Sequence, residues 1–131
     1  MPYFFLLGEM KCGTTTLYKK LLEHPQVVPP RNKEVRYLQQ PKYRKHTGSW
    51  YASNFDSVVH AAADAVTFDA SPTAFNAQAI APGWTAKWLP DARMVVMLRD
   101  PVQRTYSHFR MGVDWLKASK VRTAMMLLVQ Y

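Results

Sequence analysis

The stretch Gly8-Glu9-Met10-Lys11-Cys12-Gly13-Thr14-Thr15 decides which fold this chain can adopt. It follows the apolar run Tyr3–Leu7, which predicts a short buried strand, and it opens the stretch Thr14–Leu22, whose leucines fall on one face of a helix. A glycine-bounded loop in this position wraps phosphate, because its backbone N–H groups point inward and the start of the helix is electropositive. The sequence therefore predicts a phosphate-binding loop between the first strand and the first helix.

The loop differs from the nucleotide-hydrolase loop in the position of its lysine. The two glycines keep the spacing of that motif, but Thr14 follows the second glycine and Lys11 lies inside the loop. Lys11 is well placed there to reach a bridging oxygen that gains charge as a group departs, and Thr14 and Thr15 add hydroxyls. We expect Cys12 to be a small packed residue rather than a nucleophile, since no convincing base accompanies it. Taken alone, the loop could also be an ordinary strand–helix turn.

The rest of the chain alternates between strand and helix patterns. The predicted elements are a short extended segment at Val35–Leu38, a helix at Ser49–Ala63, a strand at Ala65–Asp69, a helical stretch at Ala74–Leu89 interrupted by Pro82-Gly83, the clearest buried strand at Arg93–Leu98, a helix at Val102–Met111 and a helix with an exposed apolar face at Lys117–Gln130. This order predicts an α/β fold with a central parallel sheet and right-handed crossovers, in which ligands bind beyond the carboxyl ends of the strands.

A second polar cluster, Leu98-Arg99-Asp100-Pro101-Val102-Gln103-Arg104-Thr105-Tyr106-Ser107, follows the last predicted strand. The Arg99 guanidinium, at the tip of that strand, can hold a phosphate through two hydrogen bonds. Asp100 makes a sensible helix start, because its carboxylate caps free N–H groups. Ser107 lies about two helical turns further along and can add a neutral donor. The alternative is a strand–helix junction in which Arg99 and Asp100 pair only locally, and we expect a structural role for Arg104.

Composition indicates one globular domain with a basic surface. The 131 residues are 48% hydrophobic and carry 17 Lys and Arg against 9 Asp and Glu, a net charge of +8. This balance favours anionic partners, and a solvated basic surface explains it equally well. The single cysteine allows no disulfide within the chain. The apolar runs at either end are too short to span a bilayer, so we expect no membrane anchor and no targeting signal in this segment.

Together the two clusters resemble the sulfotransferase family. Gly8–Leu17 is similar to its 5′-phosphosulfate-binding loop, and Leu98–Ser107 is similar to its 3′-phosphate-binding motif, R-D-P-x-x-R-x-x-S. Short signatures of the Golgi glycan and heparan-type enzymes match at His24-Pro25, Lys33-Glu34 and Ser71-Pro72. The resemblance implies a P-loop-type three-layer fold and 3′-phosphoadenosine 5′-phosphosulfate (PAPS) as the donor. It implies no metal, because lysine and backbone N–H groups take the place that magnesium has in kinases.

By position, the resemblance also implies roles for individual residues. The 3′-phosphate would be bound by Arg99 and Ser107, and the 5′-phosphosulfate by Lys11, Cys12, Gly13, Thr14, Thr15 and Thr16. Glu34 matches the place of the catalytic base in the segment K-E-x-H-[FYW], and Lys11 would stabilise the leaving phosphate.

The chain departs from the family pattern at two positions near these residues. Arg36 stands where the glycan enzymes usually have histidine, and Ala74 stands where an aromatic residue is common. For Glu34, the alternative role is a solvated carboxylate paired with Lys33 or Arg36. Lys33 is a candidate helper on the sulfonate, and His60 stays open as another base.

The resemblance further implies an incomplete enzyme. The family's domain continues well beyond this length, so we expect residues 1–131 to be a partial sulfotransferase domain that lacks the C-terminal part, binds PAPS weakly and turns over poorly by itself. The implied reaction moves a sulfuryl group from PAPS to a hydroxyl or amine. A carbohydrate is the expected acceptor, the Golgi the expected compartment, and no nucleic-acid partner is expected.

Two other functions stay open. A phosphate-transferring P-loop enzyme would need a lysine after Gly13 and an acidic residue for magnesium, for which Asp69 is the only candidate. A non-catalytic basic module would bind anions through the net charge and the stretch Lys42–Lys45. No RNA-binding signature accompanies it, and the aromatic residues Trp50, Tyr51, Trp84 and Trp88 lie at helical spacing typical of a core.

Overall fold

The computed structural model describes residues 1–38, 46–76 and 81–118. It divides the chain into two compact units, Met1–Leu98 and Arg99–Tyr131. The first unit contains β1 (Phe4–Gly8), α1 (Thr14–Leu21), α2 (Gly48–Ala52), the 3₁₀ helix η2 (Ser53–His60), β2 (Phe68–Asp69), the 3₁₀ helix η3 (Pro72–Asn76), α3 (Ala81–Trp88) and β3 (Arg93–Met97). In the second unit the described residues form one helix, α4 (Pro101–Ala118).

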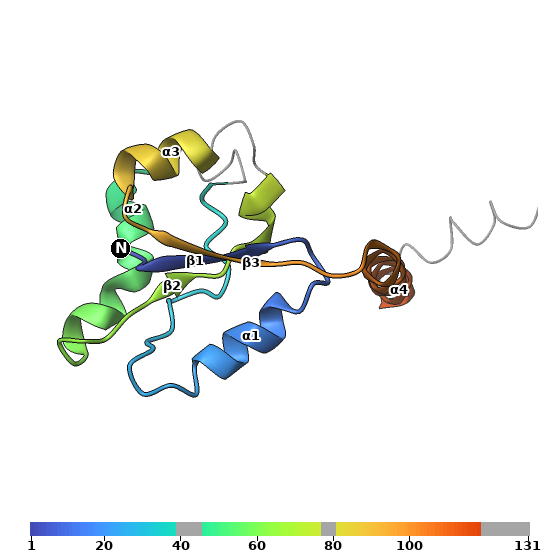
Figure 1. Ribbon diagram of the computed structural model, residues 1–131, viewed down its shortest axis with the longest axis horizontal. Helices are drawn as coiled ribbons and strands as arrows, with labels where there is room; N and C mark the ends of the chain where they lie inside the picture. Colours follow the sequence, from blue (N-terminus) through green and yellow to red (C-terminus); the bar gives the residue numbers. More distant parts are fainter. Residues whose placement is uncertain (39–45, 77–80, 119–131) are drawn as a thin grey trace, which may run out of the picture. The chain divides into compact units, whose positions relative to one another are not determined.

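A parallel sheet of three strands organises the first unit, in the order β2-β1-β3 (Figure 1). Phe4 pairs with Phe68 on one side, and residues 4–8 pair in register with residues 93–97 on the other. The strands run parallel, so their carboxyl ends lie along one edge of the sheet. That edge carries the glycine loop after β1. The predicted α/β fold with a central parallel sheet is confirmed.

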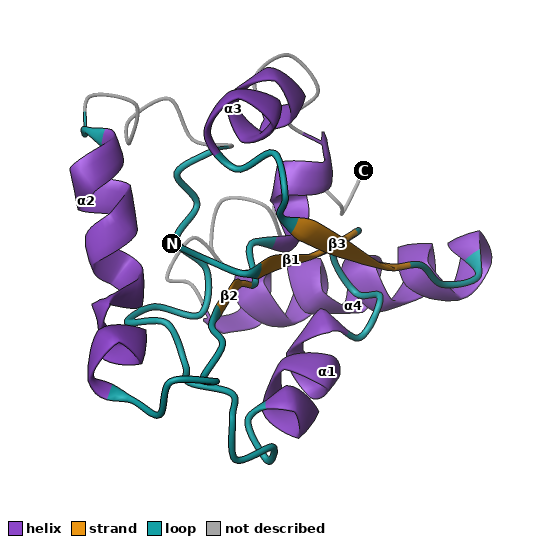
Figure 2. Cartoon of the chain, turned by 60° about the vertical axis from the view of Figure 1, so that its left-hand side comes forward, coloured by secondary structure: helices purple, strands orange, loops and turns teal. Residues whose placement is uncertain are grey.

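Helices cover both faces of this sheet, on opposite sides in Figures 1 and 2. The pleat of β1 sends Leu6 to one face and Phe5 and Leu7 to the other. On the Leu6 face, the apolar side of α1 packs against Leu6, Phe68 and Ala70. The opposite face packs against α2, η2 and α3 through Tyr51, Phe55 and Trp84. These layers give the sheet a buried core on each side.

Two of the sequence predictions about strands are wrong. Val35–Leu38 pairs with no described strand, although Val35, Tyr37 and Leu38 are buried, because Arg36 adopts a left-handed backbone with φ 59° that breaks an extended run. The strand expected to be the clearest buried one is largely exposed. Val95 and Val96 of β3 are 40% and 43% exposed, because β3 pairs only with β1 among the described strands and lies at the edge of the sheet.

Other predicted elements exist with different bounds. The helix predicted at Ser49–Ala63 is divided into α2 and η2, and the strand predicted at Ala65–Asp69 keeps only two paired residues in β2. Val66 instead forms an isolated bridge with Val27. Pro82 and Gly83 lie inside the first turn of α3, where proline is tolerated because the N–H it lacks would have no helical partner.

The helix α4 is longer than the predicted Val102–Met111. The predicted helix Lys117–Gln130 beyond Ala118, and the basic stretch Lys42–Lys45, lie outside the described residues. Of the four aromatic residues predicted to be in the core, Tyr51 is fully buried and Trp50 and Trp84 pack against the core, whereas Trp88 is 56% exposed. The prediction is therefore wrong for Trp88.

Candidate active site

The last residue of β1, Gly8, brings the chain into the loop through a conformation that requires glycine. Its φ is +145°, and a Cβ at this position would overlap the backbone carbonyl oxygen of Met97 on β3. Gly8 and Met97 are paired in register. The absence of a side chain at Gly8 therefore lets β3 approach the start of the loop closely.

The loop itself contains two further left-handed residues. Lys11 has φ 72° and Gly13, which precedes α1, has φ 91°. The N–H of Cys12 donates to the carbonyl oxygen of Glu9 at 3.3 Å and closes a turn inside the loop. The side chain of Cys12 is 6% exposed, as expected of a packed residue. This backbone forms a tight concave turn around the end of β1.

The start of α1 offers donors to an anion. The first N–H groups of a helix have no intrahelical carbonyl partner, and within the described residues no side chain caps α1. Thr14 is 5% exposed, whereas Thr15 and Thr16 are exposed on the same first turn. The helix end adds positive potential, which contributes about 0.3–1 kcal/mol per charge at an exposed site. The loop and α1 together suit a phosphate or sulfate group.

Glu34 is held by two cations. One carboxylate oxygen, Oε1, lies 3.1 Å from Lys33 Nζ, and the other, Oε2, accepts from Arg36 at 2.8 Å and 3.0 Å. These three donors leave about one of the roughly four acceptor positions of a carboxylate open. The Glu34 side chain is 26% exposed, so this open position can be reached from solvent.

The charges around Glu34 set its protonation. Partial burial works to raise the pKa of Glu34, but the hydrogen bonds and positive charges of Arg36 and Lys33 outweigh burial and hold this pKa below the ordinary value. Glu34 is therefore a carboxylate at neutral pH and can accept a proton. The low pKa also makes it a weaker base than a glutamate without cationic neighbours.

Lys33 links the Glu34 segment to the helix that follows the glycine loop. Its ammonium lies 5.9 Å from the centre of the Tyr18 ring, within cation–π range. Tyr18 stands one turn after Thr14 on α1. The structure thus places the carboxylate predicted to be the base in the same unit as the predicted phosphate loop, beside its helix.

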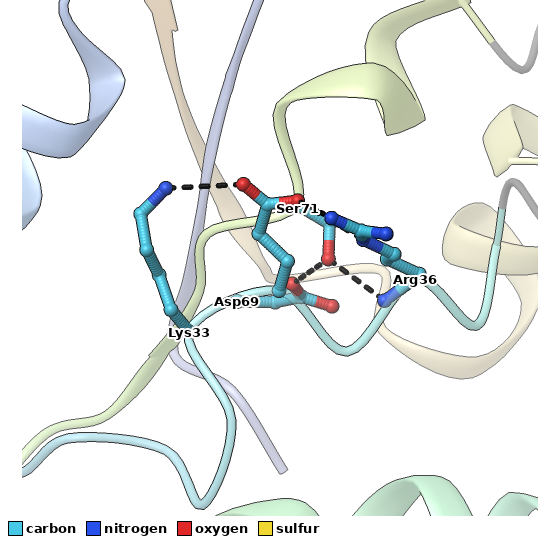
Figure 3. Close-up of polar contacts among 5 residues, drawn as sticks. Lys33, Arg36, Asp69 and Ser71 are labelled. Atoms are coloured by element: carbon cyan, nitrogen blue, oxygen red, sulfur yellow. Dashed lines mark hydrogen bonds and ion pairs between the residues drawn. The ribbon is translucent and has the colours of Figure 1, made fainter. Parts of the chain in front are cut away.

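A buried network lies behind Glu34 at the end of β2. Asp69 is 1% exposed and accepts hydrogen bonds from the hydroxyls of Tyr51 at 2.9 Å and Ser71 at 2.6 Å. The Ser71 hydroxyl also accepts the backbone N–H of Arg36 at 3.0 Å, so that Ser71 stands between Asp69 and Arg36 (Figure 3). Burial raises the pKa of Asp69 against these hydrogen bonds, and the nearby charge of Glu34 raises it further.

An open cleft of about 450 Å³ adjoins Glu34. Its lining combines two cations, one carboxylate, two amides and an indole, from residues Asn32, Lys33, Glu34, Val35, Arg36, Trp50 and Asn54. Planar aromatic, amide and charged groups of this kind suit a polar ligand that presents hydroxyl or acidic groups.

The second predicted cluster begins the second unit. Asp100 caps α4, because its carboxylate accepts the N–H of Gln103 at 2.9 Å, as the sequence predicted. Arg99 Nη2 donates to the side-chain oxygen of Gln103 at 3.3 Å. Arg99 is exposed and Ser107 half-buried, both on or next to the first turns of α4. Their guanidinium and hydroxyl groups have the chemistry to hold an anion.

Sequence reasoning missed the network behind Glu34. It noted Asp69 only as a possible magnesium ligand, Ser71 only as part of the Ser71-Pro72 signature, and Tyr51 only as a core residue. An acidic residue at the end of a buried apolar strand, followed two residues later by serine, was the available signal. A carboxylate in that place must find hydrogen-bond donors.

The fold and the site define an α/β protein with a glycine-bounded loop, suited to a phosphate or sulfate group, at the carboxyl end of the central strand of a parallel sheet. No protein-family model matches the chain. It is 32% identical over 120 residues to the membrane-associated sulfotransferase kil1 of Dictyostelium discoideum, a match that covers 92% of this chain and 25% of that protein. It is 35% identical over 115 residues to bifunctional heparan sulfate N-deacetylase/N-sulfotransferase 1 of Caenorhabditis elegans, covering 84% of this chain and 13% of that protein.

A solved structure agrees with these relatives. The crystal structure of a sulfotransferase from Alicyclobacillus acidocaldarius matches with a TM-score of 0.72 and 26% identity over 87% of this chain and 51% of that one. The chain belongs to the sulfotransferase family. It spans a quarter or less of the length of the two curated relatives named above.

Among the described helices, none is both long and apolar enough to cross a membrane. The described part of the chain also contains no group of three or more His, Cys, Asp and Glu side chains that could hold a metal ion. The family implies a sulfate donor as co-substrate.

Proposed function

We propose that this chain is the donor-binding part of a sulfotransferase domain that transfers a sulfuryl group from PAPS to a hydroxyl or amine of a carbohydrate. One observation carries the proposal. The loop after β1 has a left-handed Lys11 and Gly13 and a Gly8 without room for a side chain, in a chain that shares 32–35% identity with sulfotransferases. The names of the relatives support the acceptor class, since several act on heparan sulfate.

In this proposal the loop binds the 5′-phosphosulfate. The N–H groups of Gly13 to Thr16 and the hydroxyls of Thr14, Thr15 and Thr16 donate to its oxygens, and the Cys12 side chain packs beneath. Lys11 stabilises the negative charge that develops on the bridging oxygen as the bond from sulfur to that oxygen breaks. The positions of these residues at the start of α1, where the helix is electropositive, support this role.

Glu34 serves as the base. Its carboxylate takes the proton of the acceptor hydroxyl or amine while the acceptor atom forms its bond to sulfur, and the 5′-phosphate departs with the bridging oxygen. The open acceptor position of Glu34, its ionised state and the adjoining cleft support this assignment. Lys33, beside it, can donate to the sulfonate oxygens.

We assign Arg99 and Ser107, both in the second unit, to the 3′-phosphate of PAPS. The support is chemical, since a guanidinium holds a phosphate through two hydrogen bonds and a hydroxyl adds a neutral one. Arg99, which donates to Gln103 in this structure, would donate to the phosphate instead when the nucleotide binds.

Residues 1–131 form part of a longer catalytic domain in this proposal. The chain spans 51% of the bacterial sulfotransferase structure, and the exposed Met94, Val95 and Val96 of β3 are apolar enough to be covered by further structure. Action in the Golgi is proposed from the heparan-type relatives alone.

Calorimetry with three ligands tests the proposal. The chain should bind adenosine 3′,5′-bisphosphate, the product nucleotide, in preference to ATP with magnesium and to an RNA oligomer. Preference for ATP with magnesium would support a phosphate-transferring enzyme, and equal binding of RNA would support a basic anion-binding module. Robust sulfation of a glycan by the isolated chain would contradict the partial-domain part of the proposal.

The position of Asp69 disfavours the phosphate-transferring alternative. That reaction needs an acidic side chain open to magnesium beside the loop. Asp69 is 1% exposed, and its two carboxylate oxygens already accept from Tyr51 and Ser71.

A further inference from the structure

Asp69 and Ser71 form a buried pair for which the proposed reaction has no direct use. They are 1% and 2% exposed, behind the segment that carries Glu34 (Figure 3). Burying a carboxylate is costly unless donors fill its acceptor positions. The Tyr51 hydroxyl donates to Asp69 at 2.9 Å, the Ser71 hydroxyl donates at 2.6 Å, and the backbone of Ser71 adds a further hydrogen bond. This costly buried pair lies next to the candidate base Glu34, where it can influence the position of that base.

The carboxylate of Asp69 determines which way the Ser71 hydroxyl points. A serine has one O–H donor and two acceptor lone pairs. Asp69 Oδ1 receives the only proton at 2.6 Å, so the remaining capacity of Ser71 is to accept. It accepts the backbone N–H of Arg36 at 3.0 Å.

The bond from Arg36 to Ser71 fixes an unusual backbone. Arg36 has φ 59°, and a left-handed conformation costs a residue other than glycine about 1–2 kcal/mol. Such a conformation persists only where its surroundings hold it. The buried side chains of Val35 and Tyr37 hold the flanking residues, and Ser71 holds the N–H between them. From this turn the Arg36 guanidinium folds back onto Glu34 with bonds of 2.8 Å and 3.0 Å.

We propose that Ser71, oriented by Asp69, is a positioning residue for Glu34. It holds the Arg36 backbone in the conformation from which the guanidinium bonds one carboxylate oxygen of Glu34. The Glu34 carboxylate is thereby fixed in one orientation, and its open acceptor position with it. This inference rests on the proposed role of Glu34 as the base. The reaction rate depends strongly on the position of the base, since a displacement of about 1 Å can cost a hundredfold in rate.

The test is a titration of the Glu34 carboxyl by carbon-13 NMR in the full chain. The charged groups that face Glu34 are Lys33, Arg36 and Asp69, and Ser71→Ala substitutes none of them. Loss of the Ser71 hydroxyl also raises the pKa of Asp69, and a protonated Asp69 would lower the Glu34 midpoint, which is opposite in sign to the shift expected from the release of Arg36. The Ser71→Ala variant should release Arg36 and raise the titration midpoint of Glu34 toward that of an ordinary glutamate. Ser71→Cys, whose thiol fills the space of the hydroxyl and is somewhat larger but only a weak acceptor, should raise it in the same direction and serves if the alanine variant does not fold.

Ser57→Ala is the matched control. Ser57 is outside this network, and its hydroxyl donates to the carbonyl oxygen of Pro29 at 3.0 Å. The control should leave the Glu34 midpoint unchanged. An unchanged midpoint in both Ser71 variants would overturn the inference, because Arg36 would then hold Glu34 without Ser71.

Sulfate transfer separates this inference from the function on which it rests. In the longer catalytic domain of which residues 1–131 are proposed to be part, Ser71→Ala should lower kcat on the order of tenfold and move the acid limb of the kcat profile to higher pH, with binding of adenosine 3′,5′-bisphosphate unchanged. If Glu34→Gln keeps full activity while Ser71→Ala still moves the Glu34 midpoint, the base assignment fails and the positioning of the carboxylate by Ser71 stands.

Discussion

The two segments proposed to hold phosphate are built by different forces. In the β1–α1 loop, residues far apart in the sequence determine the backbone, since Gly8 lies against Met97 of β3 and the loop contains the left-handed Lys11 and Gly13. In the segment before α4, Arg99 and Asp100 each bond Gln103, three or four residues away. The first segment takes its shape from the sheet, and the second takes its shape from the start of a helix.

Because of this difference, substitutions in the two segments should affect folding and binding differently. A change at Gly8 disturbs the pairing of β1 with β3 and, in the proposed function, ligand binding as well, because Gly8 pairs with Met97 and leads directly into the loop. A change at Arg99 removes ligand contacts and leaves the helix to form by itself. We therefore expect folding and binding to be coupled at Gly8 and separable at Arg99.

The largest effect is expected from Gly8→Ala. Its Cβ would overlap the Met97 carbonyl oxygen, and its φ of +145° is accessible to glycine alone. We expect a loss of more than about 4 kcal/mol, enough to abolish cooperative thermal unfolding measured by circular dichroism. Gly112→Ala in α4 is the control, because nothing lies within 4 Å of its Cβ and alanine favours helix by about 1 kcal/mol. A Gly8→Ala chain that melts like the native one would remove the basis of the comparison.

Lys11→Gly should separate folding from chemistry within the loop. Glycine removes the cost of the left-handed residue, so the free energy of unfolding should rise by about 1 kcal/mol. In the longer catalytic domain proposed above, the rate of sulfate transfer should nevertheless fall on the order of 10²- to 10³-fold, because a positioned charge beside the leaving oxygen is lost. Lys19→Gly is the control: it removes the same charge inside α1, where glycine should cost about 1 kcal/mol and leave transfer unchanged. A Lys11→Gly variant that is less stable than the native chain would show that the lysine side chain supports the fold.

The sequence predicted the elements whose causes are local. Three such elements depend on only a few neighbouring residues, and each appears in the structure: the apolar strand before Gly8, the leucine face of α1 and the start of a helix at Asp100. The extended segment predicted at Val35–Leu38 has its causes elsewhere, although Val35, Tyr37 and Leu38 are buried. It failed as a strand because the left-handed Arg36 is stabilised by Ser71, thirty-five residues away.

The exposure of β3 could not be predicted from the sequence for a related reason. The run Met94-Val95-Val96 has the composition of a central strand, but burial depends on what lies on both of its sides. The same limit applies to the site. Lys11 and Glu34 were found from motifs, whereas the contact of Asp69 with Tyr51 and Ser71 depends on the packing of α2 against the end of β2.

Arg99→Ala should weaken nucleotide binding without destabilising the fold. Loss of a charge-assisted pair with phosphate costs about 1.5–3 kcal/mol, or roughly ten- to a hundredfold in the affinity for adenosine 3′,5′-bisphosphate measured by calorimetry. Binding of adenosine 5′-monophosphate, which has no 3′-phosphate, should not change. Arg110→Ala removes the same charge from an exposed site on α4 and should leave both affinities as they are. An equal loss for the two nucleotides would assign Arg99 to general attraction of anions.

The smallest effect is expected at Asp100, and it concerns how the two helices begin. The described residues provide no side-chain cap for α1, which leaves its first N–H groups to an anion, whereas the Asp100 carboxylate satisfies Gln103 at the start of α4. Asp100→Ala should lower the stability of α4 by about 1 kcal/mol, seen as faster hydrogen exchange of its first amides, while Asp100→Asn should cost only a few tenths because asparagine caps equally well. If both variants exchange alike, the charge of Asp100 rather than its hydrogen bond stabilises α4. The contrast would then be between an electropositive helix start left open for a ligand and one neutralised by its own aspartate.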